Sequence, residues 1–164
     1  IPKENLLGQL GKGFGIAMNS LDGARIGVGA IALGIAEGAL DESLAYIEQR
    51  VQFGKPISKL QGIQWYIAEM ATDIETARWM VYHAAYLRTV GKPYTKEASM
   101  CKLHCSKVAR EVTNLAMQIH GGYGYMKEYP VERMYRDAKI TEIYEGTSEI
   151  QKVIIAKQVM VPKK

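Results

Sequence analysis

Three long stretches of the chain repeat an apolar residue at alternating steps of four and three, and this period constrains the fold more than any other feature. It places the apolar side chains along one face of an α-helix. A helix of about 25 residues is about 38 Å long. Three such helices with apolar seams predict a helical bundle in which the seams face a shared core.

The first seam lies in a segment from about Ile16 to Val51, the second follows the helix-breaking Pro56, and the third stops at Gly121–Gly122, which suits a glycine C-cap. No alternation typical of a β-strand follows residue 15, so the chain is predicted to be all-α. The members of the three seams are Ala17, Leu21, Ala24, Val28, Ile31 and Ile35; Ile63, Ile67, Met70, Ile74, Ala77, Val81 and Ala84; and Ala98, Cys101, Cys105, Val108, Val112, Leu115 and Ile119.

Shorter segments complete the predicted outline. Residues 1–15 contain several glycines and no sustained period, so we expect an extended lead-in there and a bundle domain over residues 16–164. A short helical stretch is expected after Pro130. A last helix is expected to start near Thr147, because Ser148 and Gln151 have the spacing of a capping box. The predicted apolar face of this last helix consists of Ile150, Val153 and Ile154.

The first predicted helix is rich in glycine. Each glycine in a helix interior costs about 1 kcal/mol relative to alanine. This cost makes sense if a neighbouring backbone or a ligand must come close, and small residues on nearly every side favour a central, buried helix. The glycines concerned are Gly23, Gly27, Gly29, Gly34 and Gly38.

Composition and charge exclude several classes of protein. Hydrophobic residues make up 48% and charged residues 23% of 164 residues, which is the balance of one globular domain. The net charge of +4 arises from basic and acidic residues interleaved along the chain, so a mixed solvated surface is favoured over nucleic-acid binding. The longest apolar stretch, Ile26–Ala36, is too short for a membrane span. The chain starts at Ile1, not methionine, and is expected to be a fragment.

The two cysteines, Cys101 and Cys105, flank His104 at a spacing that invites a metal interpretation. A tetrahedral site needs a fourth ligand, and no second Cys/His pair accompanies these residues. Both sulfurs fall on the apolar seam, whereas His104 falls off it. We therefore predict buried free thiols and no metal site, which fits a reducing compartment.

The segment I-Y-E-G-T places Glu145 at a predicted helix break, after bulky apolar residues and before Gly146. Removal from water would raise the pKa of such a carboxylate and suit it to abstract a weakly acidic proton. Gly146 lacks a Cβ, which would let a substrate approach the backbone. From spacing alone, however, a helix stop with a solvated glutamate is the better interpretation.

Three further segments could bind a ligand. Consecutive glycines in Q-I-H-G-G-Y-G could turn backbone amides toward a ligand, although a plain C-cap explains Gly121. Arg50, in R-V-Q-F-G-K-P, could bind phosphate with its planar guanidinium, or could simply interact with a helix dipole. In D-G-A-R, Asp22 and Arg25 have the spacing of an ordinary surface ion pair. Taken singly, the structural interpretation is favoured for each.

Taken together and in this order, these segments resemble the acyl-CoA dehydrogenase family over nearly the whole chain, from IPKENLLG through DGARIGVGA, RVQFGKPI and QIHGGYGY to RDAKITEIYEGTSEIQ. The last segment is most similar to the short-chain, butyryl-CoA branch. The resemblance implies that this chain is the carboxy-terminal, up-down four-helix bundle of a longer flavoprotein. Residues 1 to about 15 would then be the exit from an upstream β domain.

The resemblance also implies a reaction, namely α,β-dehydrogenation of an acyl-CoA thioester, with a glutamate as base for the α-proton and FAD as hydride acceptor. Glu145 stands at the position of the base. In isovaleryl and long-chain members the base stands on the first bundle helix, at the position of Ala24 here, which cannot take a proton. Gly146 would contact the acyl group, whereas Asp22 and Arg25 would reach the CoA. The cofactor positions implied are Arg50, Phe53, Gln61, Gln118, Gly121 and Gly122, toward the flavin nucleotide of a neighbouring subunit, and Thr147 and Glu149, near the FAD of the catalytic site.

Sharing of the cofactor between subunits implies a homodimer or homotetramer, with electron-transfer flavoprotein as electron acceptor and a role in fatty acid metabolism. The compartment implied is the bacterial cytoplasm or the mitochondrial matrix. Because much of the flavin and acyl site would come from upstream domains, the isolated chain is expected to be inactive and to hold FAD weakly. Two alternatives stay open: an acyl-CoA oxidase-type flavoprotein, and a non-enzymatic helical interaction module.

Overall fold

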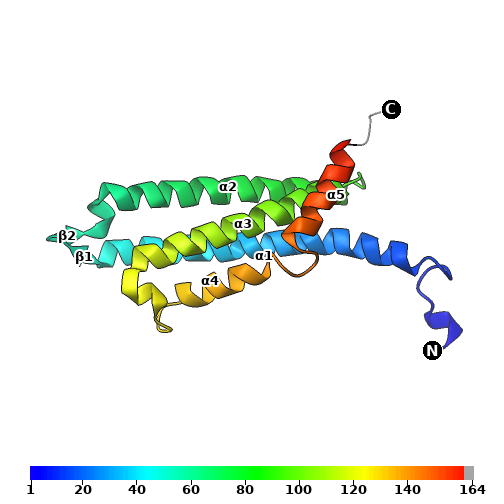
Figure 1. The fold of residues 1–164 in the computed structure, drawn as a ribbon, viewed down its shortest axis with the longest axis horizontal. Helices are drawn as coiled ribbons and strands as arrows, with labels where there is room; N and C mark the ends of the chain where they lie inside the picture. The colour runs from blue at the N-terminus through cyan, green and yellow to red at the C-terminus, as the bar shows by residue number, and fades with distance from the viewer. Residues whose placement is uncertain (161–164) are drawn as a thin grey trace.

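The computed structural model describes residues 1–160, and these form a helical bundle with almost no strand. The all-α prediction is confirmed. In Figure 1, α1 to α4 lie along one another, with consecutive helices running in opposite directions, whereas α5 crosses them. The helices are α1 (Gly13–Gln49), α2 (Gln61–Thr89), α3 (Thr95–His120), α4 (Val131–Ile140) and α5 (Ser148–Met160); short 3₁₀ helices span Lys3–Asn5, Ile57–Lys59 and Gly121–Tyr125, and the strands are β1 (Val51–Gln52) and β2 (Lys55–Pro56).

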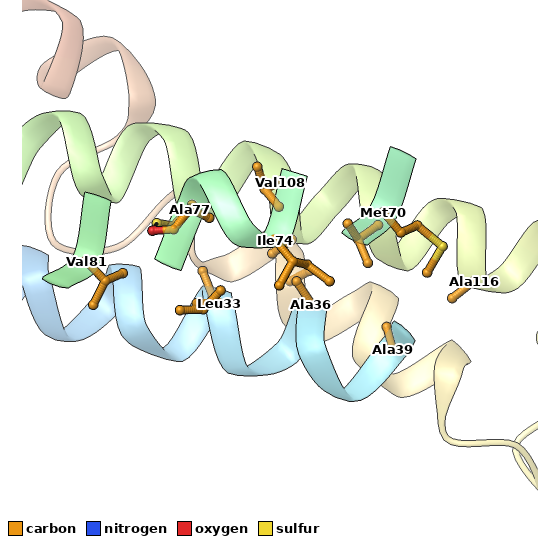
Figure 2. Close-up of a cluster of buried hydrophobic side chains, with 14 of the residues drawn as sticks. Leu33, Ala36, Ala39, Met70, Ile74, Ala77, Val81, Val108 and Ala116 are labelled. Carbon is orange, nitrogen blue, oxygen red and sulfur yellow. Dashed lines mark hydrogen bonds between the residues drawn. The ribbon is translucent and has the colours of Figure 1, made fainter. Parts of the chain in front are cut away.

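The helix α3 packs against each of the other four helices, and its predicted seam forms the centre of the core. Every member of that seam is buried except Leu115, which is half-buried. The seam of α2 is confirmed as well, with its two earliest members, Ile63 and Ile67, half-buried. Figure 2 shows Met70, Ile74 and other α2 side chains between α1 and α3. The period of four and three therefore identified the packed faces of α2 and α3.

The predicted seam of α1 is wrong in its register. Ile31 is 55% exposed, Ala17 is exposed, and Val28 alone among the six predicted members is buried. Because small apolar residues surround this helix on most sides, its period does not distinguish one face from the next. The buried positions of α1 are Arg25, Ile26, Val28, Gly29, Ala32, Leu33, Ala36, Ala39, Ser43 and Ile47.

One glycine of α1 accounts for the close approach that the sequence predicts. A Cβ on Gly29 would lie 2.5 Å from Sγ of Cys101, so α1 and α3 can approach this closely only without a side chain there. Gly27 and Gly34, by contrast, face open space, because a Cβ at either position would meet no atom of the described chain within 4 Å. A Cβ on Gly23 or Gly38 would also be tight, 3.2 Å from Arg88 and 3.3 Å from Met134, so the glycines serve helix packing at some positions but not along the whole helix.

The turn between α1 and α2 is a tight antiparallel hairpin, with Val51 opposite Pro56 and Gln52 opposite Lys55. Its two central residues have positive φ, +52° at Phe53 and +75° at Gly54. A two-residue turn of this kind matches the twist of the strands but strains any residue other than glycine. The hairpin therefore holds Phe53 outward, 88% exposed, beside the end of α1.

The last helix differs from expectation. Ile150 and Val153 of its predicted apolar face are 48% and 50% exposed, and the polar Gln151 is fully buried instead. Gln151 also does not form the predicted capping box. Its side chain turns back to the loop before α5 and donates hydrogen bonds to backbone carbonyls there.

By length and composition alone, α1 would qualify as a membrane-spanning helix. In the described structure 44% of its most apolar window is buried against the rest of the bundle, as in the core helix of many globular proteins. The absence of a membrane span stays a prediction.

Candidate active site

Glu145 lies in the loop of residues 141–147 between α4 and α5, hereafter the base loop. Its backbone is left-handed, with φ of +56°, and its side chain is half-buried. Residues other than glycine are uncommon in this conformation, and they cluster at functional sites. Gly146 follows with φ of +92°, and a Cβ there would lie 2.9 Å from Nε2 of Gln151. The predicted helix break is confirmed, and Gly146 cannot carry a side chain without displacing Gln151.

Buried side chains from α3 and α5 hold both ends of the base loop. At its start, Nζ of Lys102 and Oγ of Ser106 each donate to the carbonyl oxygen of Thr141, both at 2.9 Å. At its end, Nε2 of Gln151 donates to the carbonyl oxygens of Gly146, at 2.8 Å, and Glu145, at 3.3 Å. The conformation of Glu145 is thus imposed by contacts with two helices.

Lys102 is absent from the residues that the motifs predict, yet it is 1% exposed and is the largest fully buried side chain of the described chain. The sequence did contain a signal of this burial, because Lys102 stands four residues after Ala98 and three before Cys105, on the apolar face of its helix. Burial lowers the pKa of Lys102, and the nearby charge of Arg25 lowers it further, whereas Glu145 and Glu142 act in the opposite direction. The charges of Arg25 and Glu145 therefore both act on the Lys102 ammonium.

Asp22 and Arg25 form the predicted ion pair, with Nη1 to Oδ1 at 2.5 Å. The pair is not on the surface, however, because the two side chains are 13% and 7% exposed. The hydroxyl of Thr95 donates to Oδ2 of Asp22 at 2.5 Å, while Nε of Arg25 is buried without a partner in the described structure. A buried guanidinium with one unused donor can still bind a polar group that comes close.

A pocket of about 620 Å³ joins the end of α1 to the end of α3, hereafter the glycine pocket. It brings together four predicted cofactor residues: Arg50, Phe53, Gly121 and Gly122. Gln61 and Gln118 do not line it, and both are exposed. Gly121 has φ of +60°, and open space surrounds both glycines. The structure therefore brings together four of the six residues that the sequence places at one site.

Aromatic side chains support the glycine pocket. The rings of Tyr46 and His120 stack with centroids 4.1 Å apart, and the guanidinium of Arg50 lies 5.4 Å from the ring centre of Tyr123. Nδ1 of His120 lies 2.8 Å from the carbonyl oxygen of Ala116. Burial lowers the pKa of His120 and favours its neutral form. The pocket therefore presents one firmly placed cation, Arg50, next to a glycine turn.

Thr147 and Glu149 line a different pocket, of about 870 Å³, between α3 and α5. Hydrogen bonds from its own backbone amide and from the Thr147 hydroxyl lower the pKa of Glu149 and keep it ionised. Glu145 does not line this pocket, although it is only two residues before Thr147. The cations on its wall are Lys107, Arg110, Lys139 and Lys152.

The base loop and the glycine pocket lie toward opposite ends of α1. Arg25, near the base loop, and Arg50, at the glycine pocket, are separated by 25 positions along the chain. At 1.5 Å per residue this is about 37 Å. Of the two groups of predicted cofactor residues, the members that line a pocket accordingly line separate ones.

The glycine pocket fits the phosphates and ring of a nucleotide. Arg50 supplies a cation, the open Gly121–Gly122 turn leaves its backbone accessible, and the exposed ring of Phe53 offers a flat apolar face. No group of three or more His, Cys, Asp or Glu side chains within residues 1–160 is arranged to hold a metal ion. Cys101 and Cys105 are free and buried, as predicted.

Comparison with known proteins identifies the domain. The family model for the acyl-CoA dehydrogenase C-terminal domain matches residues 11–160. Acryloyl-CoA reductase (NADH) of Anaerotignum propionicum is 71% identical over 160 residues, which are 98% of this chain and 41% of that protein.

Two solved structures have the same fold. Butyryl-CoA dehydrogenase of Megasphaera elsdenii superposes with a TM-score of 0.96 at 54% identity, over 98% of this chain and 42% of the other. A chain in the structure of the electron transferring flavoprotein of Acidaminococcus fermentans superposes with a TM-score of 0.97 at 55% identity, over 99% of this chain and 43% of the other. The chain thus spans about two fifths of the length of these relatives. It belongs to the acyl-CoA dehydrogenase family, of which it forms the carboxy-terminal helical domain.

Proposed function

We propose that this domain serves an FAD-dependent acyl-CoA dehydrogenase that acts on short-chain acyl-CoA thioesters, with Glu145 as the base for the α-proton. The single observation that carries the proposal is the base loop, whose backbone is bound by buried Lys102 and Gln151 and in which Glu145 has a left-handed conformation. Family membership and the similarity to butyryl-CoA dehydrogenase support the reaction and the short-chain branch.

In the proposed reaction the carboxylate of Glu145 accepts the proton from the α-carbon, and the β-hydrogen leaves with its electron pair. FAD, when bound, supplies the acceptor for that hydride. Gly146 has no side chain, so its backbone would be the part that contacts the acyl group. Asp22 fixes Arg25, which is the residue that would reach toward the CoA.

We further propose that the cofactor is shared between two subunits of a homodimer, which can pair again to a homotetramer. Four residues of one cofactor group line the glycine pocket and both residues of the other line the pocket between α3 and α5, so the two groups would serve different flavins. In this arrangement Thr147 and Glu149 lie near the FAD of the catalytic site. The nucleotide of a neighbouring subunit's FAD would be bound by Arg50, Phe53, Gln61, Gln118, Gly121 and Gly122.

The relative at 71% identity is named for the opposite direction, which gives a second candidate function. In that direction the same residues would reduce a short enoyl-CoA, with Glu145 delivering the proton to the α-carbon, by microscopic reversibility. Two assays on the complete protein separate the directions: reduction of an artificial acceptor by butyryl-CoA, and oxidation of NADH in the presence of acryloyl-CoA. The proposal of a dehydrogenase predicts that the first is the faster.

Electron-transfer flavoprotein is the proposed partner for reoxidation, because the chain resembles one in a structure of that protein. An oxidase would instead react with oxygen after reduction by substrate, and stopped-flow reoxidation in air distinguishes the two. The proposed compartment is the bacterial cytoplasm or the mitochondrial matrix.

The decisive experiment is bleaching of the flavin absorbance by a panel of acyl-CoA substrates in the complete protein. We expect bleaching with butyryl-CoA and none with the Glu145→Gln variant, which keeps the shape of the side chain but cannot accept a proton. Undiminished bleaching in that variant refutes the role of Glu145. A protein with no flavin and no response to any acyl-CoA supports the interaction-module alternative.

A further inference from the structure

Lys102 occupies a place where an apolar side chain would ordinarily stand. Its ammonium is withdrawn from water and has one acceptor within residues 1–160, the carbonyl oxygen of Thr141 at 2.9 Å, although it has three protons to donate. A buried charge is costly unless neighbouring charges and hydrogen bonds compensate it. The groups around Lys102 should therefore show what the charge does.

Among the described residues, the charges of three side chains act on the Lys102 ammonium. Arg25 comes from α1, and Glu142 and Glu145 come from the base loop. Asp22 is already paired with Arg25, and the carboxylate of Glu142 is paired with Arg110, at 3.1 Å.

Glu142 also pairs with Lys139, at 2.5 Å. Within residues 1–160, Glu145 forms no ion pair within 4.0 Å. Glu145 is thus the carboxylate near Lys102 whose charge no direct ion pair balances.

Gln151 meets the same loop from the other side. Its side chain is fully buried, and its amide nitrogen donates to the carbonyls of Glu145 and Gly146. Its Oε1 has no partner in the described structure. Lys102 donates to the carbonyl of the first residue of the loop, Thr141, whereas Gln151 donates to the carbonyl of the base itself, Glu145. A left-handed glutamate persists only where its surroundings hold it, and these two side chains supply such contacts.

We infer that Lys102 and Gln151 are positioning residues for Glu145: Lys102 anchors the start of the base loop and brings a positive charge to it, and Gln151 fixes the backbone of the base. This inference rests on the proposed function of Glu145. The two residues differ in one testable respect, because Lys102 acts through a charge as well as a hydrogen bond, whereas Gln151 acts through hydrogen bonds alone.

The test measures the rate of flavin reduction by butyryl-CoA against pH, in single turnovers of the complete protein. In Lys102→Met, the ascending limb of the profile is expected to move up by about one pH unit, because a nearby cation favours the carboxylate form. In Gln151→Leu, the limiting rate is expected to fall by about tenfold to a hundredfold, with the limb unmoved, since misplacement of the base slows proton transfer at every pH. The control is Lys92→Met, an exposed lysine in the α2–α3 connection, which should match the parent protein.

A second measurement does not depend on activity. The amide of Ser148 donates to the carbonyl of Glu142 at 3.0 Å and so closes the base loop. Its hydrogen exchange should be faster in Lys102→Met and in Gln151→Leu than in the parent protein, and unchanged in Lys92→Met. If Lys102→Met does not fold, Lys102→Gln, which keeps an amide donor without the charge, takes its place with the same expected change in the pH profile.

The outcomes distinguish a failure of the proposed function of Glu145 from a failure of the positioning roles inferred for Lys102 and Gln151. If the parent protein is not bleached by any acyl-CoA, the proposed function fails, and the exchange of the Ser148 amide alone decides whether the two residues hold the loop. If bleaching occurs and Glu145→Gln abolishes it, but Lys102→Met leaves the limb in place and Gln151→Leu leaves the rate unchanged, the inference is overturned while the function stands.

Discussion

The contact between Gly29 and Cys101 allows the packing of α1 on α3 to be tested with a single methyl group. A Cβ at Gly29 would lie 2.5 Å from Sγ of Cys101, with the Cys101 carbonyl carbon and oxygen behind it at 3.6 and 3.7 Å. Overpacking of a filled core costs about 1–3 kcal/mol. Alanine in place of glycine in a helix returns about 1 kcal/mol. Gly29→Ala should therefore destabilise the fold by about 1 kcal/mol.

The same helix provides a matched control in Gly27, where an added Cβ meets no atom within 4 Å. Gly27→Ala should gain the helix propensity without the clash and stabilise the fold by up to about 1 kcal/mol. Urea denaturation of the chain, followed by circular dichroism, measures both changes in the free energy of unfolding. The comparison holds when the dependence of that free energy on urea concentration is the same in both variants. The two variants should differ by about 2 kcal/mol, taking the overpacking cost at its middle value.

A double variant identifies the cause of the loss. Cys101→Ala removes the sulfur that the new methyl group would meet, so Gly29→Ala should be less harmful in its presence than alone. An interaction energy near zero, or equal effects of Gly29→Ala and Gly27→Ala, would show that contact with Cys101 does not decide how closely α1 approaches α3.

Three further predictions concern the site. Glu145→Gln should abolish flavin bleaching by butyryl-CoA, because an amide cannot accept the α-proton; stopped-flow absorbance checks this. Arg50→Ala should weaken FAD binding by about tenfold to a hundredfold, measured by flavin release during dialysis, whereas the neighbouring exposed Lys55→Ala should not; equal losses in both would refute the specific role of Arg50. Burial lowers the pKa of His120, so the unfolded chain binds a proton that the folded chain does not, and stability should fall as pH drops below about 6.5. His120→Phe should flatten that loss in melting temperature between about pH 7.5 and pH 5.5, and an unchanged slope would contradict the assignment.

The exposed apolar surface of the bundle is consistent with a domain that packs against others. Trp65 and Trp79 on α2 are 60% and 65% exposed, and Ile31 on α1 is 55% exposed. Large exposed aromatic side chains are more frequent on surfaces that contact another protein than on the rest of a protein's surface. The upstream domains and second subunit of the proposed enzyme would cover such surfaces.

Helix formation and the location of the base loop were determined by the sequence itself. The period of four and three along α2 and α3, the stop at Gly121 and the break at Glu145–Gly146 are local features, readable from residues a few positions apart. The order of the motifs was sufficient to indicate the family. These features need no knowledge of which helix packs against which.

Only the tertiary structure decided which face of α1 is buried, because its small residues make several faces nearly equivalent and the contact of Gly29 with Cys101 selects one. The same holds for Lys102 and Gln151. Each is a polar residue on a helix: Lys102 binds a loop residue 39 positions away, and Gln151 binds carbonyls only five and six positions away but is fully buried by the fold. In both cases burial is set by the packing of the bundle, which the local period of the sequence does not reveal.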